Sequence, residues 1–330
     1  MTEHPLPADR HIHAGMSVIA VGGDSRQAVI LTRLIRAGFT VSAVGLGQAA
    51  GLISGVRLLR TPQASVEWGQ LFASAGEPCA LLLPLPLTRD GVTVSCPLDP
   101  EARIPLSDIA EAVIGTQNVS VLGGCMPPDF ADRLRQSIGG ARVADYYGSE
   151  AVQLKNARIT AEGAVMTAME LTDTALLGSR AAVVGYGRIG RSLSRLLVSL
   201  GVRVTVCARR AESLAEAWGD GCDTVDISSG GGALSCLAHG YDVIFNTVPA
   251  CLFDRALLER MDEGTHIIDL ASPPGCVSAG CGARTSRVVR ALSLPGRYAP
   301  RTAGEVLAEA VLALLKDGFG AGHGGKENGL

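Results

Sequence analysis

A glycine-rich motif is the feature of this sequence that points most directly to chemistry. Residues 185–190 read Gly-Tyr-Gly-Arg-Ile-Gly, the G-x-G-x-x-G spacing of dinucleotide-binding proteins. An apolar run at 181–184 precedes the motif and predicts a strand, and a second run at 202–206 completes a strand–helix–strand unit. In this context the motif predicts a site for a dinucleotide cofactor.

Each residue of the motif has a physical role in such a site. Gly185 makes the tight turn, Gly187 lets the backbone approach a pyrophosphate, and Gly190 lets the helix pack on the strand. The helix begins around Arg188 and Ile189, and its first N–H groups and positive dipole end face the pyrophosphate. All five residues are therefore candidate cofactor-binding residues.

The end of the second strand indicates which cofactor binds. An NAD site places an acidic residue there for the ribose 2′-hydroxyl, whereas this chain has Arg209 and Arg210. Guanidinium groups bind phosphate through paired, charge-assisted hydrogen bonds. We therefore expect NADP, with NAD possible and with one or both arginines solvated as the alternative.

Two further loops are expected at the same edge of this sheet. They follow predicted strands at 243–246 and 266–270, and ligands of open α/β sheets bind beyond the carboxyl ends of the strands. The loops should line the nicotinamide side of the cofactor. The candidate residues are Asn246, Thr247, Val248, Pro249 and Ser272.

The first half of the chain has its own turn between a strand and a helix, at residues 22–27. The turn lacks the third glycine of a dinucleotide motif, but it places Arg26 at a helix N-terminus, which suits an anionic substrate group. The alternative is a structural ion pair between Arg26 and Asp24.

A long helix is predicted to begin near Thr160, because small and apolar residues recur at helical spacing from Ala161 to Leu176. Thr160 would cap the helix and Glu162 would lie in its first turn. The sequence Leu-Gly-Ser at 177–179 would end it.

Buried apolar runs that alternate with helices predict parallel sheets covered on both faces. The fold class is therefore α/β, with two doubly wound parallel-sheet domains, the second a Rossmann NAD(P)-binding domain. Besides the strands already given, we expect strands at 17–21, 40–44, 79–83 and 118–122, and helices at 25–37 and 303–315. The expected division is a flexible extension at 1–15, a substrate domain at 16–155 plus 303–317, a Rossmann domain at 156–302 and a flexible tail at 318–330.

Composition excludes several classes of protein. The net charge of −3 argues against a nucleic-acid binder, and 47% hydrophobic with 18% charged residues argues against disorder. The longest apolar run is too short to span a membrane, and we expect a cytoplasmic protein. Nine cysteines include no C-x-x-C pair, so no metal site is expected.

Several motifs, taken together, resemble the family of dipicolinate synthase A subunits from spore-forming bacteria. The most specific are the turn at 22–27, Gly-Gly-Asp-Ser-Arg-Gln, and the stretch at 294–304. The others are found at residues 160–164, 185–190, 245–250 and 269–272.

The resemblance implies an overall likeness to the formate/glycerate dehydrogenases, with the last helix returning to the first domain. It implies NADP-dependent oxidation of dihydrodipicolinate, or of its hydrated precursor, to dipicolinate in the mother cell of a sporulating bacterium. A flavoprotein-like second subunit would be the partner in a hetero-oligomer.

Such a substrate carries two carboxylates and needs a base. The cationic candidates are Arg26, Arg301 and Lys155, and the helix N-terminus at Thr160 could hold one carboxylate. Glu162 is the favoured base, with Asp24 and Asp173 as alternatives.

Two other functions stay open. One is a 2-hydroxyacid dehydrogenase, although the loop after residue 270 lacks the arginine and histidine that this chemistry needs. The other is a non-catalytic NADP-binding protein whose partner performs the reaction.

Overall fold

The structure is a computed structural model that describes residues 16–316 apart from 50, 52, 77–78, 117–118, 230 and 278–286; the side chains of 49, 141 and 231–233 are also not described. The extension expected at 1–15 and the tail expected at 318–330 lie outside the described residues. The chain divides into two units, one holding Met1–Val152 with Pro300–Leu330 and the other holding Gln153–Ala299.

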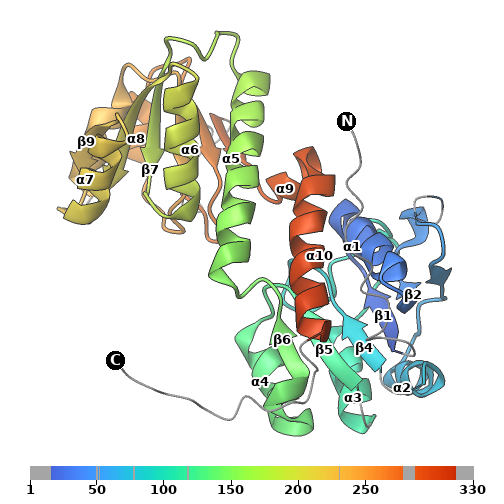
Figure 1. The fold of residues 1–330 in the computed structure, drawn as a ribbon. Coiled ribbons are helices and arrows are strands. Elements are labelled where there is room, and N and C mark those ends of the chain that lie inside the picture. Colours follow the sequence, from blue (N-terminus) through green and yellow to red (C-terminus); the bar gives the residue numbers. More distant parts are fainter. Residues whose placement is uncertain are drawn as a thin grey trace, which may run out of the picture. The chain divides into compact units, whose positions relative to one another are not determined.

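The first unit is built on a six-stranded parallel sheet in the order β3-β2-β1-β4-β5-β6 (Figure 1). The order reverses direction between β1 and β4, which makes their carboxyl ends the topological switch point. The strands are β1 Ser17–Val21, β2 Thr40–Val44, β3 Arg57–Leu58, β4 Cys79–Leu82, β5 Val119–Gly123 and β6 Val143–Asp145.

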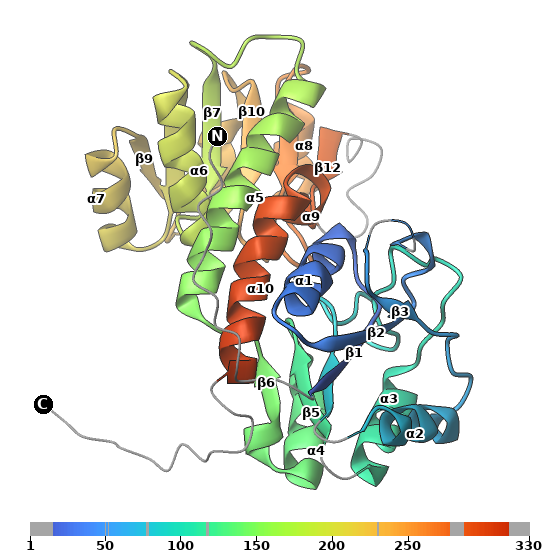
Figure 2. The ribbon, with the colours of Figure 1, turned by 45° about the vertical axis from the view of Figure 1, so that its right-hand side comes forward.

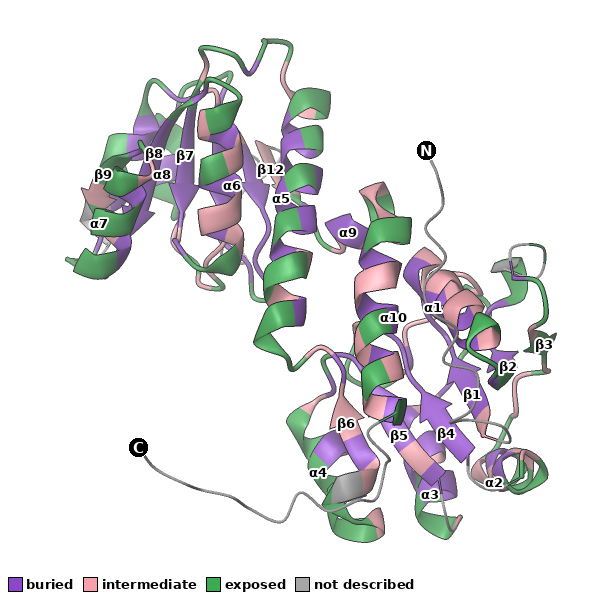
Figure 3. Ribbon diagram, in the orientation of Figure 1, coloured by how far each residue is buried: buried purple, intermediate pink, exposed green. Residues whose placement is uncertain are grey.

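Helices cover both faces of this sheet, because successive residues of each strand point to opposite sides. Ile19 and Val21 join a core with α2, α3 and α4, whereas Val18 and Ala20 join a core with α1 and α10. Figures 2 and 3 show the buried strands between these layers. The helices are α1 Ser25–Arg36, α2 Ser65–Ser74, α3 Leu106–Gly115, α4 Pro128–Ile138 and α10 Pro300–Lys316, with short 3-10 turns at Gly47–Ala49 and Gly140–Arg142.

The last helix packs closely against the first. A Cβ on Gly304 of α10 would lie 2.5 Å from the Cβ of Val29 and 3.0 Å from the carbonyl oxygen of Arg26, so the small residue is required there. An ion pair of 2.6 Å between Arg33 and Glu305 joins the two helices at the surface. The end of the chain is thereby part of the first unit.

The second unit repeats the same topology. Its sheet has the order β12-β11-β10-β7-β8-β9, again all parallel, with the switch point between β7 and β10. The strands are β7 Arg180–Val184, β8 Arg203–Ala208, β9 Asp223–Asp226, β10 Val243–Asn246, β11 His266–Asp269 and β12 Val288–Arg290. The helices are α6 Arg188–Ser199, α7 Ala211–Gly219, α8 Arg255–Arg260 and α9 Leu294–Tyr298, with a 3-10 segment at Gly231–Ala238.

Both expected ends of the long helix are wrong, and it ends at Leu171 instead of at 177–179. Helix α5 spans Glu150–Leu171 and leads from the first unit into the second, so Thr160 lies in its interior and does not cap it. The Thr160 hydroxyl donates a hydrogen bond of 2.8 Å to the carbonyl of Asn156, the usual partner of a threonine inside a helix. Glu162 is likewise not a first-turn residue, and no helix N-terminus is present at this point to hold a carboxylate.

The predicted fold class is confirmed, since both units are doubly wound parallel α/β domains. Within the described part of the chain, no helix is both long and apolar enough to cross a membrane.

Candidate functional site

The glycine-rich turn has the shape that a bound pyrophosphate requires. Gly185 has φ = +96°, and a Cβ there would collide with Oγ1 of Thr247. A Cβ on Gly190 would collide with the carbonyl oxygen of Gly185. Gly187 differs, because a Cβ there would meet nothing within 4 Å. Gly185 and Gly190 thus allow close packing within the turn, and Gly187 leaves open space over the backbone.

The N-terminus of α6 has no side-chain cap. Gly187 is its N-cap and has no side chain that could accept a hydrogen bond, and no acidic residue lies in the first turn. Arg188 is exposed, whereas Ile189 packs against the core and anchors the helix. Uncapped N–H groups and a positive dipole end favour a phosphate, so the turn fits a dinucleotide cofactor.

The loop after β10 lies against this turn across the switch point. Thr247 donates to the carbonyl oxygen of Val184 through its backbone N–H, at 2.9 Å, and through Oγ1, at 3.0 Å. Asn246 is fully buried, and its Nδ2 donates to the carbonyl of Val248. The Asn246 side chain therefore holds the loop in place, while Pro249 is exposed at its end.

A residue outside the predicted set joins the two loops. Asp269 is 1% exposed, and its Oδ1 accepts hydrogen bonds from Nδ2 of Asn246, at 2.8 Å, and from the N–H of Ala271. Its Oδ2 accepts from the N–H of Cys276, at 2.9 Å. This carboxylate fixes the loop that exposes Ser272. The sequence could have indicated Asp269, because it lies at the end of a predicted strand.

The two arginines expected at the 2′-phosphate follow β8 directly. Arg209 and Arg210 are both exposed, and neither forms an ion pair with a described residue. Asp226 pairs in register with Ala208 at the end of the neighbouring strand, and its carboxylate accepts from the N–H of Ser228. One carboxylate therefore lies on the strand beside the one that carries the arginines.

Tyr186, the second residue of the turn, is buried and anchored at its hydroxyl. That hydroxyl donates to Asp220, which also accepts from Nε of Arg195 at 2.8 Å. Burial and the nearby carboxylate keep the pKa of Tyr186 far above its ordinary value. Burial alone would raise the pKa of Asp220, but the hydrogen bonds from Arg195 and Tyr186 outweigh it and lower that pKa.

In the first unit the structure forms the ion pair that the sequence left open. Nε of Arg26 lies 2.9 Å and Nη2 lies 2.7 Å from the carboxylate of Asp24, and Nη2 also donates to the carbonyl of Leu85 at 2.5 Å. Asp24 caps α1 by accepting from the N–H of Arg26. Arg26 therefore links the turns after β1 and β4, and its charge is already balanced.

Comparison with known proteins agrees with this geometry. Residues 17–140 match the family described as the N-terminal domain of the dipicolinate synthase A subunit. The dipicolinate synthase A subunit of Bacillus subtilis (strain 168) is 25% identical over 305 residues, which are 92% of this chain and 97% of the relative. A crystal structure of the dipicolinate synthase A subunit from Bacillus halodurans matches with a TM-score of 0.74 and 29% identity, over 92% of this chain and 98% of that one.

The resemblance to the dipicolinate synthase A subunits is thereby confirmed. D-lactate dehydrogenase from Escherichia coli matches at 13% identity with a TM-score of 0.56, over 92% of this chain and 97% of that one. This second likeness is one of fold alone.

The residues that the sequence predicted for substrate binding and catalysis are found in both units. Arg301 lies in the first turn of α10 and is exposed, one turn before the Gly304 that contacts α1. Glu162 and Lys155 are exposed on the part of α5 in the second unit, and Asp173 is exposed just after that helix. No described residue donates a hydrogen bond to the carboxylate of Glu162.

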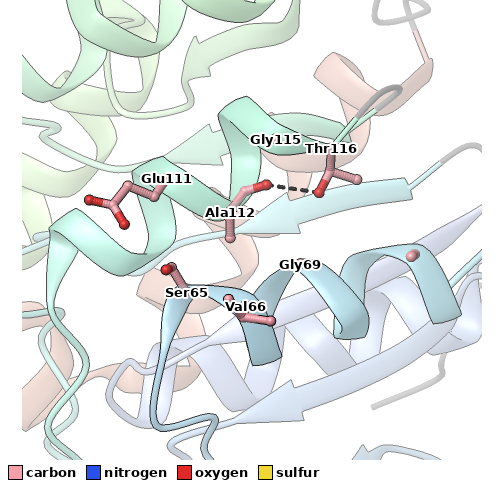
Figure 4. A pocket seen from close by; sticks show the side chains of 8 residues that line it. Ser65, Val66, Gly69, Glu111, Ala112, Gly115 and Thr116 are labelled. Carbon is pink, nitrogen blue, oxygen red and sulfur yellow. Dashed lines mark hydrogen bonds between the residues drawn. The ribbon is translucent and has the colours of Figure 1, made fainter.

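One hollow of the first unit lies away from all of these residues. Figure 4 shows it between α2 and α3, where Val66 and Gly69 face Glu111 and Thr116. Neither switch point contributes to its walls. A second kind of site is missing too, because no group of three metal-ligating side chains occurs among the described residues.

Proposed function

We propose that this chain is the A subunit of a dipicolinate synthase that oxidises dihydrodipicolinate, or its hydrated precursor, to dipicolinate. The observation that carries the proposal is the open glycine-rich turn at 185–190, in a chain that resembles a dipicolinate synthase A subunit over 92% of its length. The expected setting is the mother cell of a sporulating bacterium.

NADP is the proposed cofactor, and when bound it would accept a hydride from the substrate. The backbone around Gly187 and the first turn of α6 would hold the pyrophosphate. Arg209 and Arg210 would bind the 2′-phosphate, since both are exposed beside the strand end where it is expected. The loop at 246–249 and Ser272 would line the nicotinamide side.

The substrate would be a ring with two carboxylates. Oxidation removes a hydride from one ring atom and a proton from another, so the chain must supply a base as well as cations. Glu162 is exposed and accepts no hydrogen bond from a described residue, which suits a base. Asp24 suits one poorly, because both of its oxygens bind Arg26.

The cationic role falls mainly to Arg301. It is exposed at the start of α10, where the helix dipole adds to its charge. Arg26 has its charge balanced by Asp24 and contributes less to anion binding than the sequence suggests.

The proposed partner is a flavoprotein-like second subunit. Three large apolar side chains, Val66, Leu177 and Trp218, are 70%, 76% and 75% exposed and would be available to such a partner. Co-expression should yield a complex that survives size-exclusion chromatography at micromolar concentration. Elution of the two proteins as separate species would reject the partnership.

The test of the function is an assay of this chain alone, of its partner alone and of the two mixed. Substrate and NADP⁺ should give dipicolinate, measured by chromatography, together with an equal amount of NADPH. Turnover by the mixture that stops with Gly187→Ala in this chain supports the proposal. Turnover by the partner alone would instead make this chain a non-catalytic NADP-binding protein.

A further inference from the structure

The side chain of Gln27 is buried in the first turn of α1 with its amide nitrogen unpaired. The residue is 2% exposed, and none of the described residues accepts a hydrogen bond from Nε2. Buried polar groups in native proteins almost always have a partner, because an unpaired one lowers stability. The free chain thus keeps a donor here that it does not use itself.

This amide lies at the switch point of the first sheet. A Cβ on Gly23 would lie 2.6 Å from the Cβ of Gln27 and 3.2 Å from its Cδ, so the glutamine folds back over the turn that follows β1. Gly23 also has φ = +114°, which favours glycine for a second reason. In sheets of this topology, ligands bind beyond the strand ends at the switch point. The unpaired amide therefore lies where a ligand of this unit is expected.

Ser25, the first residue of α1, adds two donors at the same turn. Neither its backbone N–H nor its hydroxyl donates to a described residue, and its side chain is half-buried. The first N–H groups of a helix have no acceptor within the helix. Three donor groups thus meet at one turn.

The charges at this turn select the kind of acceptor. The carboxylate of Asp24 already takes the favourable position for an anion at the start of α1, and it neutralises Arg26. Asp145, at the end of β6, accepts from the N–H groups of Cys125 and Tyr147 and adds a further negative charge at the same edge of the sheet. A ligand carboxylate at Gln27 would lie beside the carboxylate of Asp24, and the charge of Arg26 at this turn is already paired with Asp24.

We propose that Gln27 and Ser25 bind an uncharged oxygen of the substrate, a hydroxyl or carbonyl group on its ring. A hydroxyl group both donates and accepts hydrogen bonds, as do the glutamine amide and the serine hydroxyl. Gln27 thereby distinguishes a ring that still carries an oxygen from one that has lost it as water. This inference rests on the proposed function, because it assigns a selectivity to the same substrate site.

The experiment compares two planar ligands by calorimetry with the full-length chain. Dipicolinate has no hydroxyl group on its ring, whereas 4-hydroxypyridine-2,6-dicarboxylate carries one and is otherwise the same molecule. Wild-type protein should bind the hydroxylated ligand on the order of tenfold more tightly, because a site built to hydrogen-bond an oxygen rejects the analogue without it. Gln27→Met should remove this preference and leave the affinity for dipicolinate within about twofold.

Thermal stability is a second measurement. If Gln27 had only a structural role, its replacement would lower Tm. Gln27→Met removes an unpaired buried amide and should raise Tm, and NADP⁺ affinity should not change. Gln136→Met, on the exposed face of α4, is the matched control.

The outcomes separate the two proposals. Equal affinity of wild-type protein for the two ligands, a preference that survives Gln27→Met, or a lower Tm in that variant would each overturn the role of Gln27 and leave the proposed function standing. Failure of the wild-type protein to bind either ligand would reject the proposed function, and the inference with it.

Discussion

Gly185 and Thr247 lie side by side at the switch point of the second sheet, so close that a Cβ on Gly185 would overlap Oγ1 of Thr247. The contact joins the turn after β7 to the loop after β10. Gly187, two residues further along the chain, differs from Gly185, because a Cβ there would meet nothing within 4 Å. The two glycines therefore have different roles.

Alanine at Gly185 should mainly lower stability, whereas alanine at Gly187 should mainly weaken cofactor binding. Gly185→Ala places a Cβ against Thr247 at φ = +96° and should lower the free energy of unfolding by about 1–3 kcal/mol. Gly187→Ala should change stability by less than about 1 kcal/mol but weaken NADP⁺ binding at least ~10-fold, because its methyl group occupies the space meant for the pyrophosphate. Denaturant unfolding and calorimetry measure the two effects. Similar profiles for both variants would contradict the assignment of these glycines.

Cofactor preference should depend on Arg209. We expect NADP⁺ to bind at least ~10-fold more tightly than NAD⁺, since each charge-assisted contact to the 2′-phosphate contributes about 1.5–3 kcal/mol. Arg209→Asp should erase or reverse this preference by repelling that phosphate. Arg260→Asp, on α8, is the control and should leave the ratio unchanged. Equal affinities in the wild-type protein, unaltered by Arg209→Asp, would refute the prediction.

Arg26 and Arg301, both in the first unit, should differ in their effects on stability and on turnover. Arg26→Ala leaves the largely buried Asp24 unpaired and frees the carbonyl of Leu85, so it should cost about 3 kcal/mol of stability. Arg301→Ala should change stability by less than about 0.5 kcal/mol, because the side chain is exposed.

The same Arg301→Ala variant should lower kcat/KM by ~30–1,000-fold, the effect of about 2–4 kcal/mol from an unpaired substrate carboxylate. NADP⁺ affinity should stay the same, since Arg301 lies outside the dinucleotide unit. Arg135→Ala on α4 serves as a surface control. Near-normal turnover of Arg301→Ala with the partner present would show that the substrate does not bind at Arg301.

Acid should weaken the second unit through Asp220. Its pKa is lower in the folded chain than in the unfolded one, because the hydrogen bonds from Arg195 and Tyr186 outweigh its burial. A lowered folded pKa stabilises the protein above the unfolded value, near 4, and this contribution disappears as the pH falls through the folded value. Unfolding of Asp220→Asn should therefore differ most from wild type at neutral pH and converge with it below about pH 4. A difference that does not change with pH would exclude this role.

Core strands could be predicted from the sequence and edge strands could not. The strands at 17–21, 40–44 and 243–246 have the predicted bounds, because most residues of each are apolar and buried. All four edge strands, β3, β6, β9 and β12, were missed. Two of them, β3 at Arg57–Leu58 and β9 at Asp223–Asp226, are largely exposed. An edge strand needs no apolar pattern, so periodicity does not reveal it.

The candidate site shows the same limit. The motif at 185–190 was predictable because it is local in sequence, and two of its glycines, Gly185 and Gly190, are required by the sterics of the turn itself. Thr160 was misjudged because threonine followed by glutamate resembles a capped helix start, whereas α5 begins at Glu150. Spacing alone could not show that Arg26 binds Asp24 and the distant carbonyl of Leu85, because that link depends on how β1 and β4 meet.

The two units use one topology but cap their equivalent helices differently. Helix α1 begins with the carboxylate of Asp24 bound to the N–H of Arg26, whereas α6 begins at Gly187 with no side chain in that position. A protein carboxylate thus permanently occupies, in the first unit, the place that the proposed diphosphate would take in the second. The stoichiometry follows from this difference: although the chain contains the nucleotide-binding topology twice, we expect calorimetry to count one dinucleotide per chain.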